Sequence, residues 1–337
     1  MKELHVGVVG LGLGRHHLAA YAQAEAVGRL VICDTDAERL ARTRAELAEV
    51  AAAYQDVEAM LGAERLDAVS IVTPDHLHRP HAEACLRAGC HVLLTKPLAT
   101  NLQDGRSIVR AAEAAGRKLM VAHERRFRSR FKRIRQMLDA GALGQIIHVR
   151  IDAIQDKRQQ FAQSPWYASA EAGRTPLVGS GIHEVDLLRH FIGKPIRSVC
   201  AYSNRLGGLD FPTDKTTAAL YRFDGGAIGQ VTVTYEAHWP RAGAADDAFR
   251  LVGTKGIIVG HQAAIDAADG WEQLPEDPQP IVTGTRGCIE NFLRAVLAGA
   301  PVAVTGRDAF ASLAACAAAD ESAATGKPTV PAAADFE

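Results

Sequence analysis

Three glycines and one aspartate near the N-terminus have the types and spacing of a nucleotide-binding site. Gly10, Gly12 and Gly14 follow an apolar run at residues 4–9, and Asp34 ends the next apolar run, 20 residues after Gly14. Glycines let the backbone turn sharply and approach a pyrophosphate, and the helix after the turn directs free N–H groups and its positive dipole end at the phosphates. An acid at the end of the second strand accepts hydrogen bonds from ribose hydroxyls. The stretch therefore predicts a dinucleotide site.

The glycine turn departs from the usual G-x-G-x-x-G spacing. Its third glycine comes one residue early, and Arg15 stands where that glycine is expected, but the strand, helix and acid around the turn still fit the dinucleotide reading. Asp34 repels a 2′-phosphate, and no Arg or Lys follows before Arg39, so we predict NAD(H) rather than NADP(H). The residues expected to contact the cofactor lie in this turn or at the ends of later strands: Gly10, Gly12, Leu13, Gly14, Arg15, Asp34, Thr73, Pro74, His78 and Lys96.

Two further side chains have the chemistry that hydride transfer needs. Lys96 follows a strand on the cofactor side, where an ammonium group stabilises an alkoxide and, if burial lowers its pKa, donates a proton; the alternative is a surface lysine at a turn. His183 opens a helix three residues before Asp186, so the two share one helix face. For His183 taken alone, a buried structural histidine is the favoured alternative.

The elements that must carry these residues alternate between strand and helix up to residue 122. Short apolar runs indicate buried strands, and Pro74 stops one of them. Strands alternating with helices predict a parallel doubly wound sheet, in which ligands gather at the carboxyl ends of the strands. The expected strands are 4–9, 30–33, 51–54, 67–73, 91–95 and 118–122, and the expected helices are 15–26, 36–50, 56–61, 78–88 and 101–115.

The pattern changes from residue 126 onward, where period-two alternation predicts a mostly antiparallel sheet with one face covered. We therefore expect an α/β protein with a dinucleotide-binding Rossmann domain at 1–122 and a substrate-binding α/β domain at 123–337, whose terminal helices can pack back on the first domain. The expected strands are 145–155, 198–204, 216–222, 227–235, 248–252 and 257–259, and the expected helices are 127–140, 181–191, 286–298 and 307–324.

Composition argues against several classes of function. The chain has 337 residues, enough for two domains, and its 47% hydrophobic and 23% charged residues are normal for a soluble globular protein. A formal net charge of −1 gives no argument for a nucleic-acid or anionic-membrane partner. No stretch reaches the ~20 apolar residues of a membrane span. The N-terminus lacks a signal-peptide layout and the cysteines form no C-x-x-C, so we expect a cytoplasmic protein with reduced thiols.

Two clusters of side chains have simpler explanations than a ligand site. The basic residues from Arg125 to Arg135 spread round a helix, which favours a solvated face over a nucleic-acid site, with Arg126 the one most suited to face the cleft. His76, His78 and His81 have no Cys or acid at ligand spacing, so no metal is expected.

Together these motifs resemble the Gfo/Idh/MocA family of oxidoreductases, which includes glucose–fructose oxidoreductase and inositol dehydrogenase. The resemblance covers nearly the whole chain and rests on GLGLGRHH, CDTD, VTPDHLH, GCHVLLTKPLATN, the RRF before a helix, DAGALGQI, SGIHEVDLLRHFIG and NFLRAVLAGAPVAVTGRDA. It implies a second domain with a large, mostly antiparallel sheet that often forms an oligomer interface. A homodimer or homotetramer with the active site between the domains is therefore expected.

The resemblance also implies roles for single residues. Lys96 falls on the family's E-K-P lysine, which touches the nicotinamide ribose and the substrate hydroxyl, and His183 falls on the histidine of D-x-G-x-H-x-x-D, a general acid or base. Thr95 replaces the Glu of the first motif and Gly179 the first Asp of the second, so the usual Asp–His arrangement cannot operate. Arg174-Thr175-Pro176 replaces a common Gly-Gly-Gly run; Arg174 either brings positive charge to the substrate or caps the loop.

The favoured function is hydride transfer between NAD and a carbinol carbon of a sugar, polyol or related small molecule. His183 would exchange the hydroxyl proton and Lys96 would stabilise the alkoxide. The alternatives are sugar elimination, hydrolysis or epimerisation with transient use of retained NAD, and a non-catalytic NAD-binding regulator. Trp166 offers an aromatic face to a sugar ring, with a core role as the alternative. The residues expected to bind substrate are His123, Arg126, Trp166, Arg174 and His183.

Overall fold

A computed structural model describes residues 3–239, 245–246, 248–266 and 269–332 of the chain. Six parallel strands form the sheet of its N-terminal domain. Their spatial order is β3-β2-β1-β4-β5-β6, the doubly wound arrangement that the sequence predicts. The strands are β1 (Leu4–Val9), β2 (Val27–Cys33), β3 (Val50–Tyr54), β4 (Ala68–Ile71), β5 (His91–Thr95) and β6 (Leu119–Ala122).

Side-chain caps begin three of the helices in this domain. Asp36, Asp56 and Asn101 each accept a hydrogen bond from the backbone N–H three residues later, which satisfies one free donor of the first turn. The helix expected at 15–26 ends at Ala22 instead, because β2 begins at Val27. The helices are α1 (Gly14–Ala22), α2 (Ala37–Glu46), α3 (Val57–Ala63), α4 (His78–Arg87) and α5 (Leu102–Ala114).

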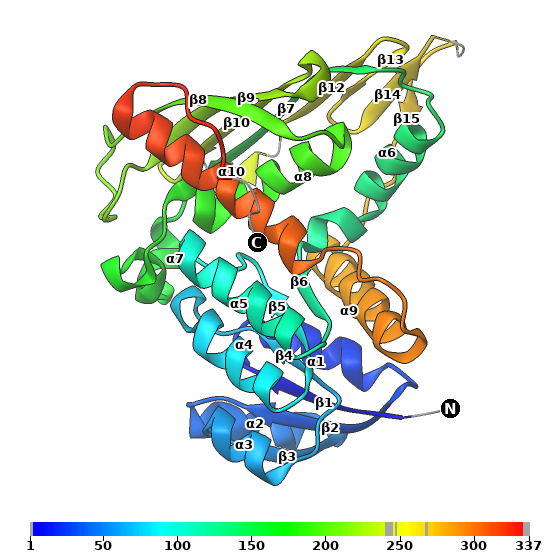
Figure 1. Cartoon of the computed structure of the whole chain (residues 1–337), viewed down its shortest axis with the longest axis vertical. Coiled ribbons are helices and arrows are strands. Elements are labelled where there is room, and N and C mark those ends of the chain that lie inside the picture. Colours follow the sequence, from blue (N-terminus) through cyan, green and yellow to red (C-terminus); the bar gives the residue numbers. More distant parts are fainter. Residues whose placement is uncertain (1–2, 240–244, 247, 267–268, 333–337) are drawn as a thin grey trace.

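A second, larger sheet of nine strands dominates the C-terminal domain, and Figure 1 shows it at the opposite end of the molecule from β1. Its order is β15-β14-β13-β12-β7-β10-β9-β8, with β11 paired to β7; β7 and β10 run parallel and the other pairs run antiparallel. This confirms the mostly antiparallel prediction. The strands are β7 (Ile146–Gln155), β8 (Ile196–Asn204), β9 (Thr216–Phe223), β10 (Ile228–Thr234), β11 (Ala245–Asp246), β12 (Phe249–Gly253), β13 (Gly256–Val259), β14 (Gln262–Ile265) and β15 (Glu272–Gln273).

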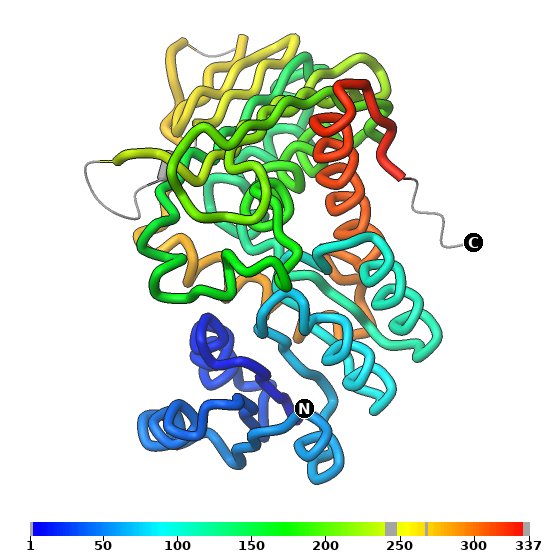
Figure 2. The backbone as a smooth tube through the Cα atoms, turned by 90° about the vertical axis from the view of Figure 1, so that its left-hand side faces the viewer, coloured from blue at the N-terminus to red at the C-terminus, as the bar shows by residue number. Residues whose placement is uncertain are grey.

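Two helices of the second half, α9 and α10, pack on the first domain, and in Figure 2 the red-to-orange helix α10 runs from the large sheet toward that domain. Residues of α9, among them Cys288 and Phe292, lie in one hydrophobic cluster with Leu18 and Tyr21 of α1, so a helix from the end of the chain completes the core of the first domain. The helices are α6 (Ser129–Asp139), α7 (Arg158–Gln163), α8 (Ile182–Ile192), α9 (Pro280–Ala298) and α10 (Gly306–Thr325).

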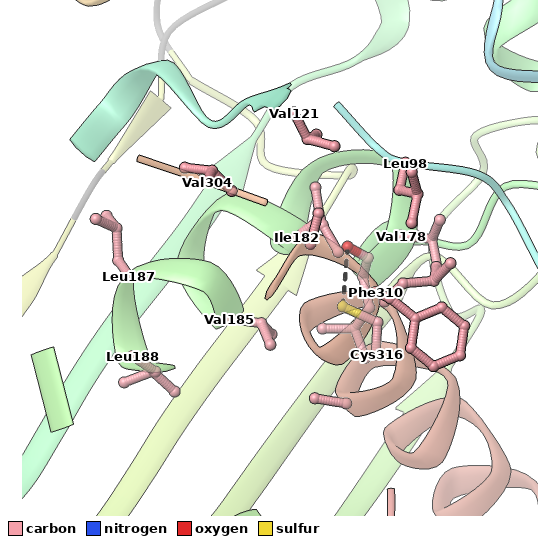
Figure 3. Packing of buried hydrophobic residues seen from close by; sticks show 14 of the residues in the cluster. Leu98, Val121, Val178, Ile182, Val185, Leu187, Leu188, Val304, Phe310 and Cys316 are labelled. Atoms are coloured by element: carbon pink, nitrogen blue, oxygen red, sulfur yellow. Dashed lines mark hydrogen bonds between the residues drawn. The ribbon is translucent and has the colours of Figure 1, made fainter. Parts of the chain in front are cut away.

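The start of α8 is fixed by packing against α10. Figure 3 shows Phe310 and Cys316 of α10 beside Val178 and Ile182, and the Cys316 thiol lies 3.9 Å from the carbonyl of Leu177. Leu177–Gly181 forms a short π-helical turn that leads directly into α8. The position of this turn, which carries Gly179, is thus set by the core.

Candidate active site

The glycine turn between β1 and α1 leaves room for a pyrophosphate. Gly10 has φ +85°, and a Cβ there would lie 2.5 Å from the carbonyl oxygen of Val72, so only glycine fits. A Cβ on Gly12 would meet no atom within 4 Å, which is open space on the side where the phosphates are expected. Gly14 starts α1, and its Cβ position is 3.4 Å from Val72, a close approach of helix and strand. The turn therefore fits a bound dinucleotide.

Asp34 is held at the end of β2 with its carboxylate directed at this turn. It accepts hydrogen bonds from the backbone N–H of Leu11 at 2.7 Å and of Asp36 at 3.0 Å. The guanidinium of Arg39, 40% exposed, donates to both carboxylate oxygens at 3.1 and 3.0 Å. The acid that the sequence assigned to the ribose is therefore fixed in place and has a cationic neighbour.

His78 does not have the surroundings expected of a cofactor ligand. It is fully buried, and its ring nitrogens lie 2.8 Å from the carbonyl oxygen of Pro97 and 3.1 Å from that of Thr73. Burial lowers its pKa. The His78 ring thus holds the loops after β4 and β5 together, and its predicted contact with the cofactor stays a prediction. Of the remaining predicted cofactor residues, Leu13 lies in the glycine turn and Arg15 in the first turn of α1, and Thr73 and Pro74 lie in the loop after β4.

A cavity of about 350 Å³ connects the glycine turn to the C-terminal sheet. Lys96 and His183, 87 residues apart in the chain, both line it, together with Arg174. Its full lining is Leu13, His16, His17, Val72, Thr95, Lys96, Ala122, Glu124, Arg125, Arg128, Gln155, Lys157, Gln160, Phe161, Tyr167, Arg174, Gly179, Ser180, His183, Tyr235, Ile281 and Thr285.

Lys96 is poised for proton exchange near neutral pH. Its ammonium donates a hydrogen bond to the carbonyl oxygen of Gly179 at 3.1 Å. Burial and the nearby charge of Arg174 lower its pKa from 10.5 to about 8. A lysine with such a pKa is present in both protonation states under ordinary conditions, unlike a surface lysine.

His183 is neutral in these surroundings. Burial, followed by the positive charges of Lys96 and Arg125, lowers its pKa well below the ordinary 6.5. Its Nδ1 has no hydrogen-bond partner among the described residues. Its ring lies edge-on to that of His123, with 6.2 Å between centroids. His183 therefore offers a neutral imidazole to the cavity.

Arg126 and His123 lie behind the cavity and are absent from its lining. The guanidinium of Arg126 donates to both carboxylate oxygens of Asp186 at 2.8 and 2.5 Å and also pairs with Asp308 at 2.8 Å. His123 Nδ1 is 3.6 Å from Asp186, and burial lowers the pKa of His123 to about 4. We correct the predicted substrate contacts accordingly: Arg126 is committed to a buried ion pair, and His123 backs the ring of His183.

Trp166 is also absent from the residues that line the cavity, whereas its neighbour Tyr167 is among them. The Trp166 ring stacks on that of Tyr167, with 3.9 Å between centroids. The guanidinium carbon of Arg174 lies 4.7 Å from the centre of the Tyr167 ring. Tyr167 therefore contributes to the aromatic lining of the cavity, together with Phe161 and Tyr235.

Arg174 occupies the volume that a side chain at position 179 would need. Its Nη2 donates to the Gly179 carbonyl at 2.6 Å and its Nη1 pairs with Asp75 at 3.2 Å. A Cβ on Gly179 would lie 2.7 Å from both Arg174 Nε and the Tyr235 hydroxyl. The family's aspartate is thus replaced here by a glycine whose place is filled by a buried arginine.

Lys157 is the principal residue of the cavity that sequence reasoning missed. Its ammonium donates to the side-chain oxygen of Gln160 at 2.7 Å. Burial and the charges of Lys96 and Arg174 lower its pKa from 10.5 to about 7. The sequence did contain a signal for Lys157. It lies two residues after the expected end of a long strand, β7, much as Lys96 directly follows β5.

No cluster of three His, Cys, Asp or Glu residues suited to a metal occurs among the described residues. In the same described part of the chain, no helix combines the length and the apolar character that crossing a membrane requires.

The chain matches two family models. Residues 4–123 match an oxidoreductase family with an NAD-binding Rossmann fold, and residues 131–259 match the GFO/IDH/MocA C-terminal domain. Inositol 2-dehydrogenase 2 of Saccharopolyspora erythraea is 29% identical over 96% of this chain and 94% of its own. D-apiose dehydrogenase of Paraburkholderia graminis is 28% identical over 83% of this chain and 74% of its own.

A solved structure has the same arrangement. Levoglucosan dehydrogenase, in complex with NADH and levoglucosan, superimposes with a TM-score of 0.85 at 25% identity, over 98% of this chain and all of that one. These matches confirm the predicted family and an NAD cofactor. The chain belongs to the Gfo/Idh/MocA oxidoreductases, with an NAD-binding Rossmann domain followed by the family's C-terminal domain.

Proposed function

We propose that the protein is an NAD-dependent dehydrogenase that oxidises a carbinol carbon of a sugar-like or polyol-like substrate, or reduces the corresponding carbonyl. The observation that carries this proposal is that one and the same cavity contacts the glycine turn, Lys96 and His183. Relatives named as inositol, apiose and levoglucosan dehydrogenases support the substrate class. When bound, NAD supplies the hydride acceptor or donor.

The proton of the substrate hydroxyl is the part of the reaction that this chain must manage. Sequence reasoning gave it to His183, but an imidazole whose pKa is lowered so far accepts a proton poorly. Lys96, with a pKa of about 8, is better matched. We therefore assign proton exchange and alkoxide stabilisation to Lys96, and hydrogen bonding to the same hydroxyl to neutral His183.

A panel of sugars, inositols and keto-sugars tests the proposal, with NADH absorbance followed in both directions. At least one member should give net NADH formation or consumption. NADH binding without turnover of any member would contradict the dehydrogenase assignment. Sugar conversion with retained cofactor and no net NADH change would support transient redox chemistry instead.

We also propose that the protein forms a homodimer or homotetramer through the outer face of the large sheet. Tyr202, Leu220 and Ile228 on β8, β9 and β10 are 79%, 51% and 46% exposed. Leu220 lies opposite Cys200, two residues from Tyr202, so these side chains share one face. Light scattering should give a dimer or tetramer for the native chain and a smaller species for Leu220→Glu; an unchanged mass would contradict this interface.

All six cysteines are free, as is typical of proteins in a reducing compartment. We accordingly infer a cytoplasmic location, which fractionation of the source cells would test.

A further inference from the structure

The charge of the cavity is strongly one-sided. Five cationic side chains line it and one carboxylate does, that of Glu124. The cations are Lys96, Arg125, Arg128, Lys157 and Arg174. A cavity built only to hold uncharged hydroxyls needs no such excess, because hydroxyls are satisfied by neutral donors and acceptors.

The three arginines have carboxylate partners within the protein. Arg128 forms a bidentate pair with Glu124, at 3.0 Å for each contact, and Arg174 pairs with Asp75 at 3.2 Å. Arg125 pairs with the buried Glu184. Their charges are therefore largely balanced where they lie.

The two lysines have no such partner in the described part of the chain. Lys96 donates to the carbonyl of Gly179 and Lys157 to the amide oxygen of Gln160, both uncharged acceptors. Each ammonium has three N–H groups, so most of their donor capacity is unused by these contacts. The charged form of a buried amine is costly, so each lysine holds its proton weakly until an anion lies beside it.

We propose that the substrate of this enzyme carries a carboxylate, bound by the ammonium group of Lys157 while Lys96 acts on the reacting hydroxyl, so that the chain acts on a hydroxylated acid of the aldonic or uronic type. This inference rests on the proposed dehydrogenase function and specifies its substrate. A carboxylate fits better than a phosphate because the planar donor edge of Arg174 is already engaged by Asp75 and Gly179. The ammonium of Lys157, whose one hydrogen-bond partner among the described residues is the neutral side-chain oxygen of Gln160, then remains for the carboxylate.

Matched pairs of substrates test the inference: D-gluconate against D-glucitol, and D-glucuronate against D-glucose, with D-glucose 6-phosphate as a third arm. We expect kcat/KM for an acid at least tenfold above that for its neutral partner. Lys157→Met should lower kcat/KM for the acid about thirtyfold, the loss expected for one charge-assisted hydrogen bond, and should lower kcat/KM for the neutral partner by a clearly smaller factor. Lys157→Arg should restore part of the loss, and the exposed Lys132→Met serves as the matched control.

Calorimetry gives a second readout that does not depend on turnover. Binding of the acid to the enzyme–NADH complex at pH 8, measured in two buffers of different ionisation enthalpy, should take up protons, because an anion beside the lysines raises their pKa. Lys157→Met should reduce this uptake.

Preference for the neutral partners, or equal losses for acid and neutral substrates in Lys157→Met, would overturn the inference. Preference for the sugar phosphate over both acids would overturn the choice of carboxylate. If no compound turns over, the dehydrogenase proposal fails, while acid binding with proton uptake still supports the anion site and its absence refutes it.

Discussion

Replacing Gly179 by alanine adds one methyl group at the most crowded point of the site. The new Cβ would lie 2.7 Å from Arg174 Nε and 2.7 Å from the Tyr235 hydroxyl, closer than real Cβ contacts. Arg174 cannot withdraw easily because its guanidinium is buried and bonded to Asp75 and the Gly179 carbonyl. Overpacking of this kind costs about 2 kcal/mol of unfolding free energy. Because Lys96 donates to the same carbonyl, kcat should also fall, by about tenfold.

Urea unfolding and steady-state kinetics of Gly179→Ala measure both effects. Gly62→Ala is the matched control, since a Cβ at that helical position meets nothing within 4 Å and alanine favours helices by about 1 kcal/mol over glycine. The control should be as stable as the native protein or more so. If Gly179→Ala retained both native stability and native kcat, Arg174 would not fill the place of the family's aspartate as we conclude.

Three shorter predictions concern the cofactor, an ion pair and pH. NADH should bind at least tenfold tighter than NADPH because Asp34 faces the ribose. Asp34→Ala should reduce this difference between the two dissociation constants in a fluorescence titration, and tighter binding of NADPH than of NADH by the native protein would refute the prediction. Arg126→Met should lose about 3 kcal/mol of unfolding free energy, because the carboxylate of Asp186 stays buried without its partner. The KM of the folded variant should change little, and a large change in KM would instead indicate that Arg126 contacts the substrate. Because the folded pKa of Lys96 is about 8 and its unfolded value 10.5, the folded protein binds fewer protons between these values and stability rises with pH there. Lys96→Met should therefore be more stable than the native chain below pH 8, an advantage that disappears by about pH 10.5 in urea titrations; an advantage independent of pH would contradict the lowered pKa.

The sequence specified the first domain well because its signals are local. Apolar runs, glycine turns and capping residues such as Asp36, Asp56 and Asn101 each act within a few residues, and the strand order follows from the alternation of strand and helix. Errors arose where an element is short or its boundary signal was overlooked. The short strands β14 and β15 carry too few residues for a visible period. Helix α9 begins at Pro280 rather than 286, and a proline in the first helical turn is a local signal that the sequence does contain.

The candidate site was predicted less completely because burial is not visible in a sequence. Lys96 and His183 were identified from motifs, but the low pKa of His183 depends on charges brought from Arg125 and Lys96 in space. Arg126 stands beside Arg125 in the chain, yet only the structure distinguishes the one that lines the cavity from the one committed to Asp186.

The central claim is that the Lys96 ammonium acts on the reacting hydroxyl beside bound NAD. Single-turnover hydride transfer, followed as NADH absorbance with a substrate found in the panel, tests it most directly in Lys96→Met against the surface control Lys132→Met. We predict a hydride-transfer rate at least a hundredfold lower in Lys96→Met, with NADH affinity within threefold of native. A rate within threefold of native in Lys96→Met, at unchanged NADH affinity, would contradict the account.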